Sequence, residues 1–274
     1  MSNLNYSITF ACYNQVEYTK TCINSMIEHG YDLSRLAVVD NGSTDDTRAY
    51  LAALPLGALI LNKSNLGCGV AWNQGALALQ AEWTIIMNND VILPANWVEN
   101  LINTAVKNNL KVISPALIEG DLDYDFKQLA TEASSKMQYC LRLGARNAVC
   151  LAVHQSVWMD IGYFQPIPKL LGYEDTMFFN ELDKANIPTA ITGAVFLHHY
   201  GSVTQNAMKQ ERGLSKKDGL PHRYNYRLLK QNWFTRKLIK IKRKNQEKIW
   251  RNNEIAEFGM TTHGVRAKGE FTWQ

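Results

Sequence analysis

Residues 36–46 read LAVVDNGSTDD, a short apolar run that ends in a polar turn. Leu36–Val39 has the length and composition of a buried strand. One of the residues Ser43–Asp45 can cap a helix that begins near Asp46, because short polar side chains accept hydrogen bonds from the first amides of a helix. The stretch therefore predicts a strand, a loop and a helix in direct succession.

The same alternation continues on both sides of this stretch. Short apolar runs predict further strands, and apolar residues at helical spacing predict the helices between them. The additional strands of this half are Tyr6–Ala11, Ala58–Leu61 and Trp83–Met87, and the helices are Tyr18–His29 and Gly69–Leu79. Strands separated by helices in this way indicate an α/β fold with a doubly wound, mostly parallel sheet.

Beyond Pro94 the alternation is less regular. Apolar runs predict strands at Lys111–Ile118, Ala148–Val153 and Ala190–Leu197, and helical spacing predicts helices at Trp97–Lys107, Gln155–Ile161 and Asp175–Ala185. The polar stretch Glu119–Gln138 fits neither pattern. We expect its Asp121–Asp125 segment, which contains a D-x-D repeat, to be a solvated loop.

The bulk composition is typical of a folded globular protein, with 274 residues, of which 46% are hydrophobic and 20% charged. No apolar run approaches the roughly 18 residues of a membrane span, and the N-terminus MSNLNYSITF does not look like a signal peptide. The five cysteines show neither metal-ligand spacing nor a disulfide pattern, which predicts buried thiols in a reducing cytoplasm. They are Cys12, Cys22, Cys68, Cys140 and Cys150.

The net charge of +4 is unevenly distributed. Between Lys230 and Arg251, nine Lys or Arg residues accompany a single acid, so this segment carries +8 and the rest of the chain −4. Such a basic amphipathic segment suits an anionic membrane surface, or it packs on the protein with a solvated basic face. Nucleic acid is a weaker match, because the body is acidic and lacks a nucleic-acid motif. The interleaved apolar residues are Trp233, Phe234, Leu238, Ile241, Ile249 and Trp250.

Polar clusters follow several predicted strands, at the edge where parallel sheets bind ligands. Cys12-Tyr13-Asn14 follows the first strand, Asp40 ends the second, and Asn88-Asn89-Asp90 follows the fourth. Asp90 suits Mg²⁺ or Mn²⁺ bound to phosphate oxygens, but the same three residues also suit a turn before a helix. Asp40 is equally consistent with a nucleotide contact and with a plain turn.

Three further motifs each allow two interpretations. Asn65–Gly69 precedes a helix, so its glycines either admit a phosphate or ribose or form an ordinary loop. Glu174-Asp175 supplies either first-turn acids or a general base, and His198-His199 supplies either a metal ligand or ordinary surface or core histidines. Arg142 or Arg146 is a candidate to reach a phosphate or the acceptor.

Taken in order, these motifs resemble those of family 2 glycosyltransferases of the GT-A fold, in the rhamnosyltransferase-like branch of bacterial glycan assembly. The resemblance covers about residues 6–204 and lies in the order and spacing of several motifs. A nicotinamide-dependent dehydrogenase would instead carry G-x-G-x-x-G after the first strand. The matching stretches are Ile8–Asn14, Val39–Asp45, Asn65–Gly75 with Asn73, Asn88–Asp90, Gly172–Asp175 and His199–Thr204.

The resemblance implies an inverting transfer of a sugar from a UDP- or dTDP-sugar to a hydroxyl group of a glycan or lipid-linked acceptor. It implies a cytoplasmic enzyme that assembles polysaccharide, peripheral at the inner face of the plasma membrane. Asp175 would be the general base with Glu174 beside it, and Asp90 and His199 would hold Mn²⁺ or Mg²⁺, with His198 as the alternative ligand. The implied donor-binding residues are Cys12, Tyr13, Asn14, Asp40, Asn65, Gly67, Asn73, Asn88, Asn89 and Asp90.

Asn88 stands where the family often has the first carboxylate of an Asp-x-Asp metal motif. That departure supports a second hypothesis, a catalytically inactive GT-A-like module that binds a nucleotide or glycan. The resemblance also implies a catalytic domain over residues 1–212, with a nucleotide-sugar half over about 1–95 and an acceptor half over about 96–212. A basic helical extension over residues 213–274 would follow it.

Overall fold

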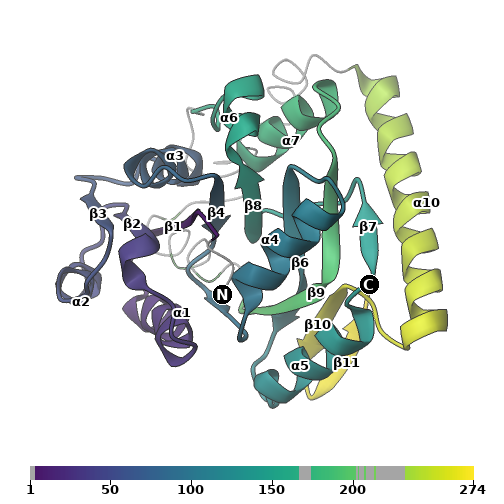
Figure 1. Cartoon of the computed structure of the whole chain (residues 1–274), viewed down its shortest axis with the longest axis horizontal. Helices are drawn as coiled ribbons and strands as arrows, with labels where there is room; N and C mark the ends of the chain where they lie inside the picture. The colour runs from purple at the N-terminus through teal and green to yellow at the C-terminus, as the bar shows by residue number, and fades with distance from the viewer. Residues whose placement is uncertain (1–3, 167–173, 202, 204–206, 208–212, 214–231) are drawn as a thin grey trace.

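The computed structural model describes residues 4–166, 174–201, 203, 207, 213 and 232–274 (Figure 1). An eleven-stranded sheet forms the centre of this described part, with the main order β11-β10-β6-β8-β4-β1-β2-β3. Its strands are β1 (Tyr6–Cys12), β2 (Leu36–Asp40), β3 (Ala58–Leu61), β4 (Trp83–Met87), β5 (Val91–Ile92), β6 (Val112–Gly120), β7 (Leu141–Leu143), β8 (Cys150–His154), β9 (Thr189–His199), β10 (His263–Ala267) and β11 (Glu270–Trp273). The α-helices are α1 (Val16–Glu28), α2 (Thr47–Ala52), α3 (Cys68–Ala78), α4 (Trp97–Lys107), α5 (Phe126–Met137), α6 (Gln155–Ile161), α7 (Glu174–Lys184) and α10 (Trp233–Phe258).

The first half of the sheet is parallel. β1 pairs with β2 on one side and with β4 on the other, and β2 pairs with β3. Parallel neighbours need crossover connections, which α1, α2 and α3 supply in turn. The predicted doubly wound α/β arrangement of this half is confirmed.

The second half of the sheet is mixed in direction. β8 lies between β4 and β6 and is antiparallel to both, whereas β6 is parallel to β9 and β10. The short strands β5 and β7 pair antiparallel with β9. Of the ten strand pairings among the described residues, five are parallel and five antiparallel. The predicted parallel order therefore holds in the first half, whereas the pattern of apolar runs did not indicate the antiparallel pairings of the second half.

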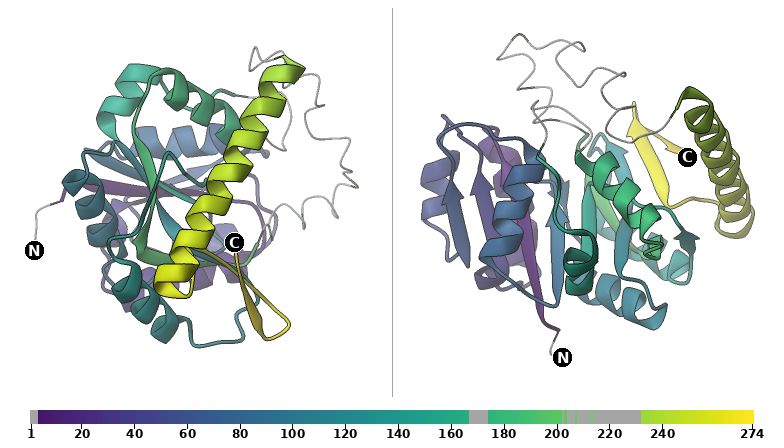
Figure 2. Two further views of the ribbon diagram at one scale, coloured as in Figure 1. Left: turned by 90° about the vertical axis from the view of Figure 1, so that its right-hand side faces the viewer. Right: turned by 90° about the horizontal axis from the view of Figure 1, so that it is seen from above.

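Helices cover both faces of the sheet (Figures 1 and 2). Side chains alternate along a strand, so Ile85 of β4 joins a core with α1, α2 and α4, and Ile86 joins a core with α3, α6 and α7. The second core includes Trp72, Val157 and Phe178. Burial on both faces explains why β2 and β4 read as nearly continuous apolar runs.

The polar stretch Glu119–Gln138 contains a helix that the sequence analysis missed. α5 begins after Asp125, whose side chain accepts a hydrogen bond from the Gln128 amide at 2.9 Å. Its apolar residues Phe126, Ala130, Ala133 and Met137 are buried against β6 and β9. Their spacing of four, three and four residues was the available signal.

The C-terminal region is more than a helical extension. After α10, the hairpin of β10 and β11 returns to the central sheet, where β10 pairs parallel with β6. Glu254 of α10 forms a buried ion pair with Arg142, with 2.6 Å between the Glu254 carboxylate and Arg142 Nε. Arg146 binds Asp183 at 2.6 Å, and the Asp183 side of this ion pair is exposed. The expectation that Arg142 reaches a phosphate or the acceptor is wrong, because its guanidinium group is buried and held by Glu254. For Arg146 the expectation stays a prediction.

The cysteines and the helices bear on two expectations drawn from the composition. All five cysteines are free thiols, and Cys12, Cys22 and Cys150 are buried, while Cys68 and Cys140 are half-buried. Within the described ranges, no helix has the length and apolar content needed to cross a bilayer. The expected domain boundary near residue 212 lies outside the described residues, as do Gly172, Tyr173, Ser202 and Thr204 of the matching motifs.

Candidate active site

The loops after β1 and β2 are joined at the carboxyl edge of the sheet. Asn14 lies in the left-handed region, with φ of 52°, and its side-chain oxygen accepts a hydrogen bond from the Thr44 amide at 2.8 Å. The Asn14 amide donates in turn to Ser43 Oγ at 2.8 Å. Asn14 therefore holds the DNGSTDD turn against the end of β1, where the sequence analysis placed part of a donor site.

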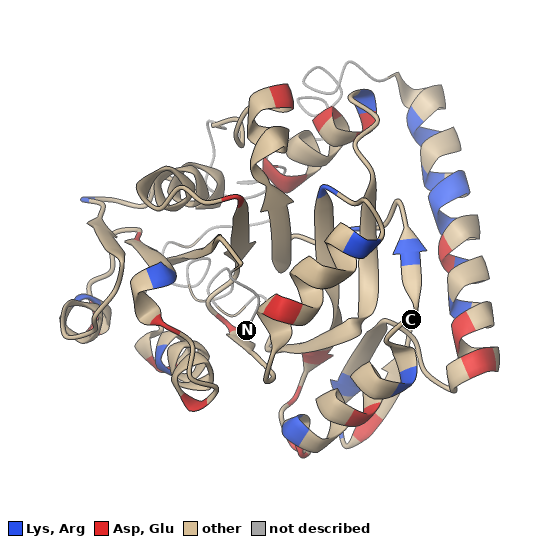
Figure 3. Ribbon diagram, in the orientation of Figure 1, with Lys and Arg blue, Asp and Glu red and all other residues tan. Residues whose placement is uncertain are grey.

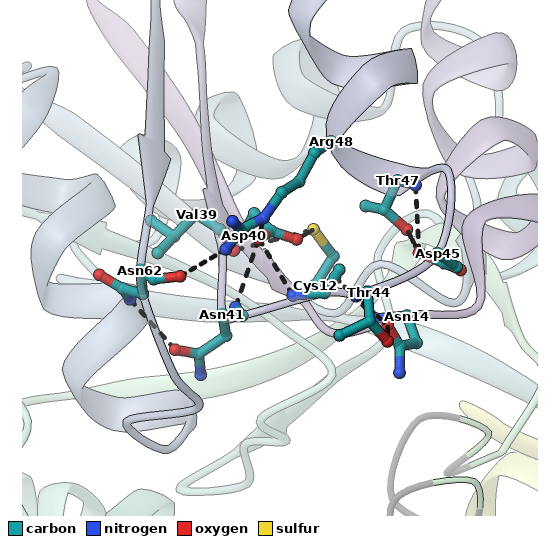
Figure 4. Close-up of polar contacts among 12 residues, drawn as sticks. Cys12, Asn14, Val39, Asp40, Asn41, Thr44, Asp45, Thr47, Arg48 and Asn62 are labelled. Atoms are coloured by element: carbon teal, nitrogen blue, oxygen red, sulfur yellow. Dashed lines mark hydrogen bonds and ion pairs between the residues drawn. The ribbon is translucent and has the colours of Figure 1, made fainter.

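Asp40 lies at the centre of a polar cluster beneath this turn (Figure 4). Its side chain is fully buried, and Oδ1 accepts hydrogen bonds from Arg48 Nε at 2.6 Å and from the Ser43 amide at 3.1 Å. The Cys12 thiol lies 4.0 Å from Oδ2. Arg48, which the sequence analysis did not select, thus neutralises Asp40. A direct contact between Asp40 and a nucleobase would require these bonds to rearrange, and it stays a prediction.

Asn41 connects the turn after β2 to the loop before α3. Its side chain donates to Asn65 Oδ1 at 2.9 Å and accepts from the Leu66 amide at 3.0 Å. The two loops approach so closely at Gly42 that a Cβ atom there would lie 2.9 Å from Ser64 Cα. Gly42 also has φ of +93°, which favours glycine. Asn41 therefore organises the loop that carries the predicted donor residues Asn65 and Gly67.

Other predicted donor residues have protein partners in the structure. Asn73 binds both main-chain groups of Phe164, at 2.7 Å through its amide nitrogen and at 3.0 Å through its oxygen. Asn89 donates to Thr19 of α1 at 3.0 Å and is buried. These contacts position loops around the site. Donor contacts by Cys12, Tyr13, Asn73 and Asn89 stay predictions.

Asp90 and His199 lie side by side, although they are more than a hundred residues apart in the chain. β5 pairs with β9 so that Val91 is opposite His199, which brings the preceding Asp90 to the end of β9. The His199 Nε2 atom lies 3.3 Å from Asp90 Oδ1, and the Asn88 side-chain nitrogen lies 3.4 Å from the same Nε2. Asp90 and His199, the metal ligands that the resemblance implies, are therefore neighbours in the structure, and their role as ligands stays a prediction.

His198 faces the other side of β9. Its ring packs against Tyr124, Phe126 and Tyr200, and its Nδ1 is 2.9 Å from the Tyr124 hydroxyl. Burial, together with the nearby charge of His199, lowers the pKa of His198 to about 4, so it is a neutral core histidine. His199, and not His198, is therefore the histidine that shares a site with Asp90.

The surroundings of His199 include two residues that the sequence analysis missed. Glu119 of β6 lies 2.9 Å from His199 Nδ1 with one oxygen and 3.0 Å from His263 Nε2 with the other. These two bonds lower the pKa of Glu119 well below its usual value. Burial opposes a charge on His199, but the bonds to Asp90 and Glu119 outweigh it and raise its pKa to about 9.

The Asp90–His199 pair fits the requirements of a divalent cation. Asp90 Oδ1 and His199 Nε2 lie 3.3 Å apart, so one cation could contact both atoms. Mg²⁺ and Mn²⁺ need few protein ligands, because substrate phosphates and waters complete their shells. Within the described residues, no three His, Cys, Asp or Glu side chains are arranged to hold a metal. Asp90 and His199 are the two residues of this cluster that could hold a divalent cation.

Glu174 and Asp175 begin α7 beside the start of α3. A Cβ atom on Gly69 would lie 3.0 Å from Glu174 Cβ, so the glycine allows this close approach. Burial, and then the charges of Glu174, Asp90 and Asp175, raise the pKa of the Cys68 thiol to about 12. The charges of Glu174, Asp90 and Asp175 thus all act at the start of α3.

Glu174 and Asp175 differ in environment. Glu174 is buried, its Oε2 has no hydrogen-bond partner among the described residues, and burial raises its pKa to about 7. Asp175 is half-buried and accepts a hydrogen bond from the Thr176 amide at 2.7 Å. Of the two carboxylates, Asp175 is the more accessible to a substrate hydroxyl.

We expect Glu174 to make the stability of the protein depend on pH. Its folded pKa of about 7 exceeds the ordinary value of 4.5, so the native state holds more protons than the unfolded state between these values. The free energy of unfolding should therefore fall as the pH rises from about 4.5 to 7. Glu174→Gln should remove this contribution. Urea unfolding at pH 5, 6, 7 and 8 should show that the free energy of unfolding of the variant rises relative to that of the wild type as the pH rises. The control is Glu132→Gln on the exposed face of α5, whose difference in unfolding free energy from the wild type should be the same at all four pH values.

Comparisons with known proteins agree with this architecture. The model of the family described as Glycosyl transferase family 2 matches residues 7–164. An uncharacterized glycosyltransferase of Rickettsia felis is 28% identical over 135 residues, which are 48% of this chain and 21% of that protein. The chain thus spans about a fifth of the length of this relative.

Two solved structures share the fold. The mannosyltransferase PcManGT from Pyrobaculum calidifontis, in complex with GDP-Man and Mn²⁺, matches with a TM-score of 0.56 and 16% identity, over 77% of this chain and 61% of that one. S. aureus TarS 1–349 in complex with UDP-GlcNAc matches with a TM-score of 0.54 and 15% identity, over 71% and 58%. These likenesses confirm the expected GT-A fold. The family match covers more than half of the chain, and the chain belongs to glycosyl transferase family 2.

Proposed function

We propose that the chain transfers a sugar from a UDP- or dTDP-sugar to a hydroxyl group of a glycan or lipid-linked acceptor, with inversion at the anomeric carbon. The observation that carries this proposal is the position of Asp90 beside His199, while Glu174 and Asp175 begin α7 against Gly69 at the start of α3. A cation ligand pair and a candidate base thus lie at the carboxyl edge of the sheet, where α/β proteins bind ligands. Complexes with GDP-Man and Mn²⁺ and with UDP-GlcNAc among proteins of the same fold support a nucleotide-sugar donor.

In the proposed reaction, Asp175 accepts the proton of the acceptor hydroxyl as that oxygen attacks the anomeric carbon. Asp90 and His199 would hold Mn²⁺ or Mg²⁺, which when bound neutralises charge on the departing diphosphate. Glu174 shapes the site beside Asp175. Asn14, Asp40, Asn65 and Gly67 line or support the donor loops.

The proposed roles of these residues also divide the chain into regions. Residues 1–95 would bind the nucleotide-sugar and residues 96–212 the acceptor, with residues 213–274 as the basic C-terminal region. We place the reaction in the assembly of a polysaccharide at the cytoplasmic side of a membrane.

The experiment that tests this function is a screen of nucleotide sugars for metal-dependent release of the free nucleoside diphosphate. We expect release of UDP or TDP in the presence of Mn²⁺ or Mg²⁺ and its loss in EDTA. If a nucleotide sugar binds but no diphosphate is released, with any acceptor supplied, the chain is instead the inactive GT-A-like binding module. Asn88 in place of a carboxylate is the feature that favours this second candidate.

We further propose that α10 rests on an anionic membrane surface. Phe234, Leu238, Ile241 and Ile249 are between 48% and 62% exposed. Their spacing places them along one side of the helix. Glu254, the buried residue of α10, follows Ile249 by five positions, or about 140° around the helix axis, so the apolar stripe faces away from the body. Basic residues occur along much of α10 (Figure 3), and the helical spacing places Lys237, Lys242 and Lys248 beside the stripe.

A triple variant tests this surface. Phe234→Ser, Leu238→Ser and Ile241→Ser together should weaken binding to vesicles of phosphatidylcholine and phosphatidylglycerol at least about tenfold, because each side chain loses apolar burial in the lipid. Sedimentation with the vesicles measures the loss, and high salt should release the wild type. The matched control replaces equally exposed apolar residues on other helices, namely Leu77, Val106 and Met159, each with Ser. Equal binding by the two triple variants would contradict the proposal.

A further inference from the structure

A row of polar side chains crosses three adjacent strands beside the proposed cation site. His199 of β9 is opposite Glu119 of β6, and Glu119 is opposite Val265 of β10. His263 lies two residues before Val265, and alternate residues of a strand share a face. His199, Glu119 and His263 therefore lie on one face of the sheet, in line with Asp90 at the end of the row.

The bonds within this row determine which nitrogen of His199 faces Asp90. Glu119 Oε1 lies 2.9 Å from His199 Nδ1, and Glu119 Oε2 lies 3.0 Å from His263 Nε2. An ionised carboxylate only accepts hydrogen bonds, so each of these ring nitrogens donates one. With its hydrogen on Nδ1, His199 has only Nε2 left to act as a ligand. That atom is the one 3.3 Å from Asp90 Oδ1.

We propose that Glu119, held by His263 of the C-terminal hairpin, is a positioning residue that keeps His199 Nε2 directed at Asp90 and the cation. This inference rests on the proposed function, because it requires a cation at the Asp90–His199 pair. Carboxylate partners commonly orient histidine ligands in this way, and their loss typically weakens metal binding about 10–100-fold.

The C-terminal hairpin thereby becomes part of the site. The family match ends at residue 164, so His199 and His263 both lie beyond it. β10 is held beside β6 by main-chain pairing and by the ion pair of Arg266 with Asp123 at 2.6 Å. His263 of the hairpin and His199 of β9 therefore contact Glu119 from opposite sides of β6.

The test is calorimetric titration of Mn²⁺ into the full chain without donor. Glu119→Ala should weaken Mn²⁺ binding about 10–100-fold. Glu119→Gln should weaken it less, because the amide oxygen still accepts from His199 Nδ1, and His263→Ala should have the smallest effect. Histidine ¹⁵N NMR supplies a second readout, in which the hydrogen on His199 Nδ1 is present in the wild type and is no longer held there in Glu119→Ala.

Arg266→Ala is the matched control, because it disturbs the same hairpin by removing the Arg266–Asp123 ion pair while leaving the contacts of Glu119 intact. It should bind Mn²⁺ like the wild type. Wild-type affinity in Glu119→Ala, or an equal loss in Arg266→Ala, would overturn the positioning role while leaving the proposed function in place. A wild-type chain that binds no Mn²⁺, alone or with a nucleoside diphosphate, would overturn both.

Discussion

Asp175→Asn should lower the turnover number about 10²–10⁴-fold, the range typical of a lost general base. Asparagine keeps the size of the side chain and an oxygen that can accept the Thr176 amide, so the start of α7 should stay folded. It has no basic carboxylate for the acceptor hydroxyl. Donor affinity should change little, because the proposed donor residues lie in α3, at the ends of β1 and β2, and on the loops after β1, β3 and β4. Steady-state kinetics with the best donor of the screen, together with calorimetry of the nucleoside diphosphate, measures both quantities.

The matched control for this prediction is Asp183→Asn, the same change on the same helix. Asp183 is exposed and binds Arg146, two turns from the start of α7. The turnover number of Asp183→Asn should stay close to that of the wild type. Wild-type turnover in Asp175→Asn would remove Asp175 from the role of base. Glu174 would then be the carboxylate to test next, because burial raises its pKa to about 7.

Asp90→Ala should lower kcat/KM at least about 10²-fold, because it removes the carboxylate of the proposed cation site. Unlike Asp175→Asn, it should also weaken the binding of Mn²⁺ and of the nucleoside diphosphate. The loss of Asp90 also leaves His199 without its partner at 3.3 Å and Val203 without a hydrogen bond at 3.2 Å. Thermal unfolding is therefore measured alongside calorimetry, so that a folding defect is separated from a binding defect.

Asp90→Asn and Asp160→Ala complete this comparison. The asparagine keeps the size of the side chain and an oxygen, so it should restore folding but not Mn²⁺ affinity. Asp160 lies on the exposed surface of α6, so Asp160→Ala should change neither folding nor Mn²⁺ affinity. If Asp90→Asn binds Mn²⁺ and the diphosphate as tightly as the wild type, the cation is held elsewhere.

The parts of the fold that the sequence revealed are those with strong local signals. Buried parallel strands such as Leu36–Asp40 are apolar on both faces, and the polar turns after them mark the ligand-binding edge. α5 was missed because it has only four buried residues, two of them alanines, so the surrounding polar residues concealed their helical spacing. The hairpin of β10 and β11 was missed because its partner strand, β6, precedes it by more than 140 residues.

The candidate site, like the fold, could be predicted only where the sequence signal is local. Asp90, Asp175 and His199 could be selected as candidates because each lies in a motif at or next to the end of an element. Glu119 and His263 carry no motif, and their roles arise only from strand pairing that places them beside His199. Arg48 likewise has meaning only through its ion pair with Asp40. Arg142 shows the reverse error, since its partner Glu254 lies on a distant helix that nothing near Arg142 in the sequence indicates.

A crystal structure with Mn²⁺ and the preferred nucleoside diphosphate tests the central claim most directly. The anomalous signal of manganese locates the ion independently of the protein coordinates. We expect a single peak coordinated by the Asp90 carboxylate and His199 Nε2, bridging to the diphosphate at the carboxyl edge of the sheet. A diphosphate bound on another face of the molecule, or a manganese peak away from both side chains, would contradict the assignment of this site.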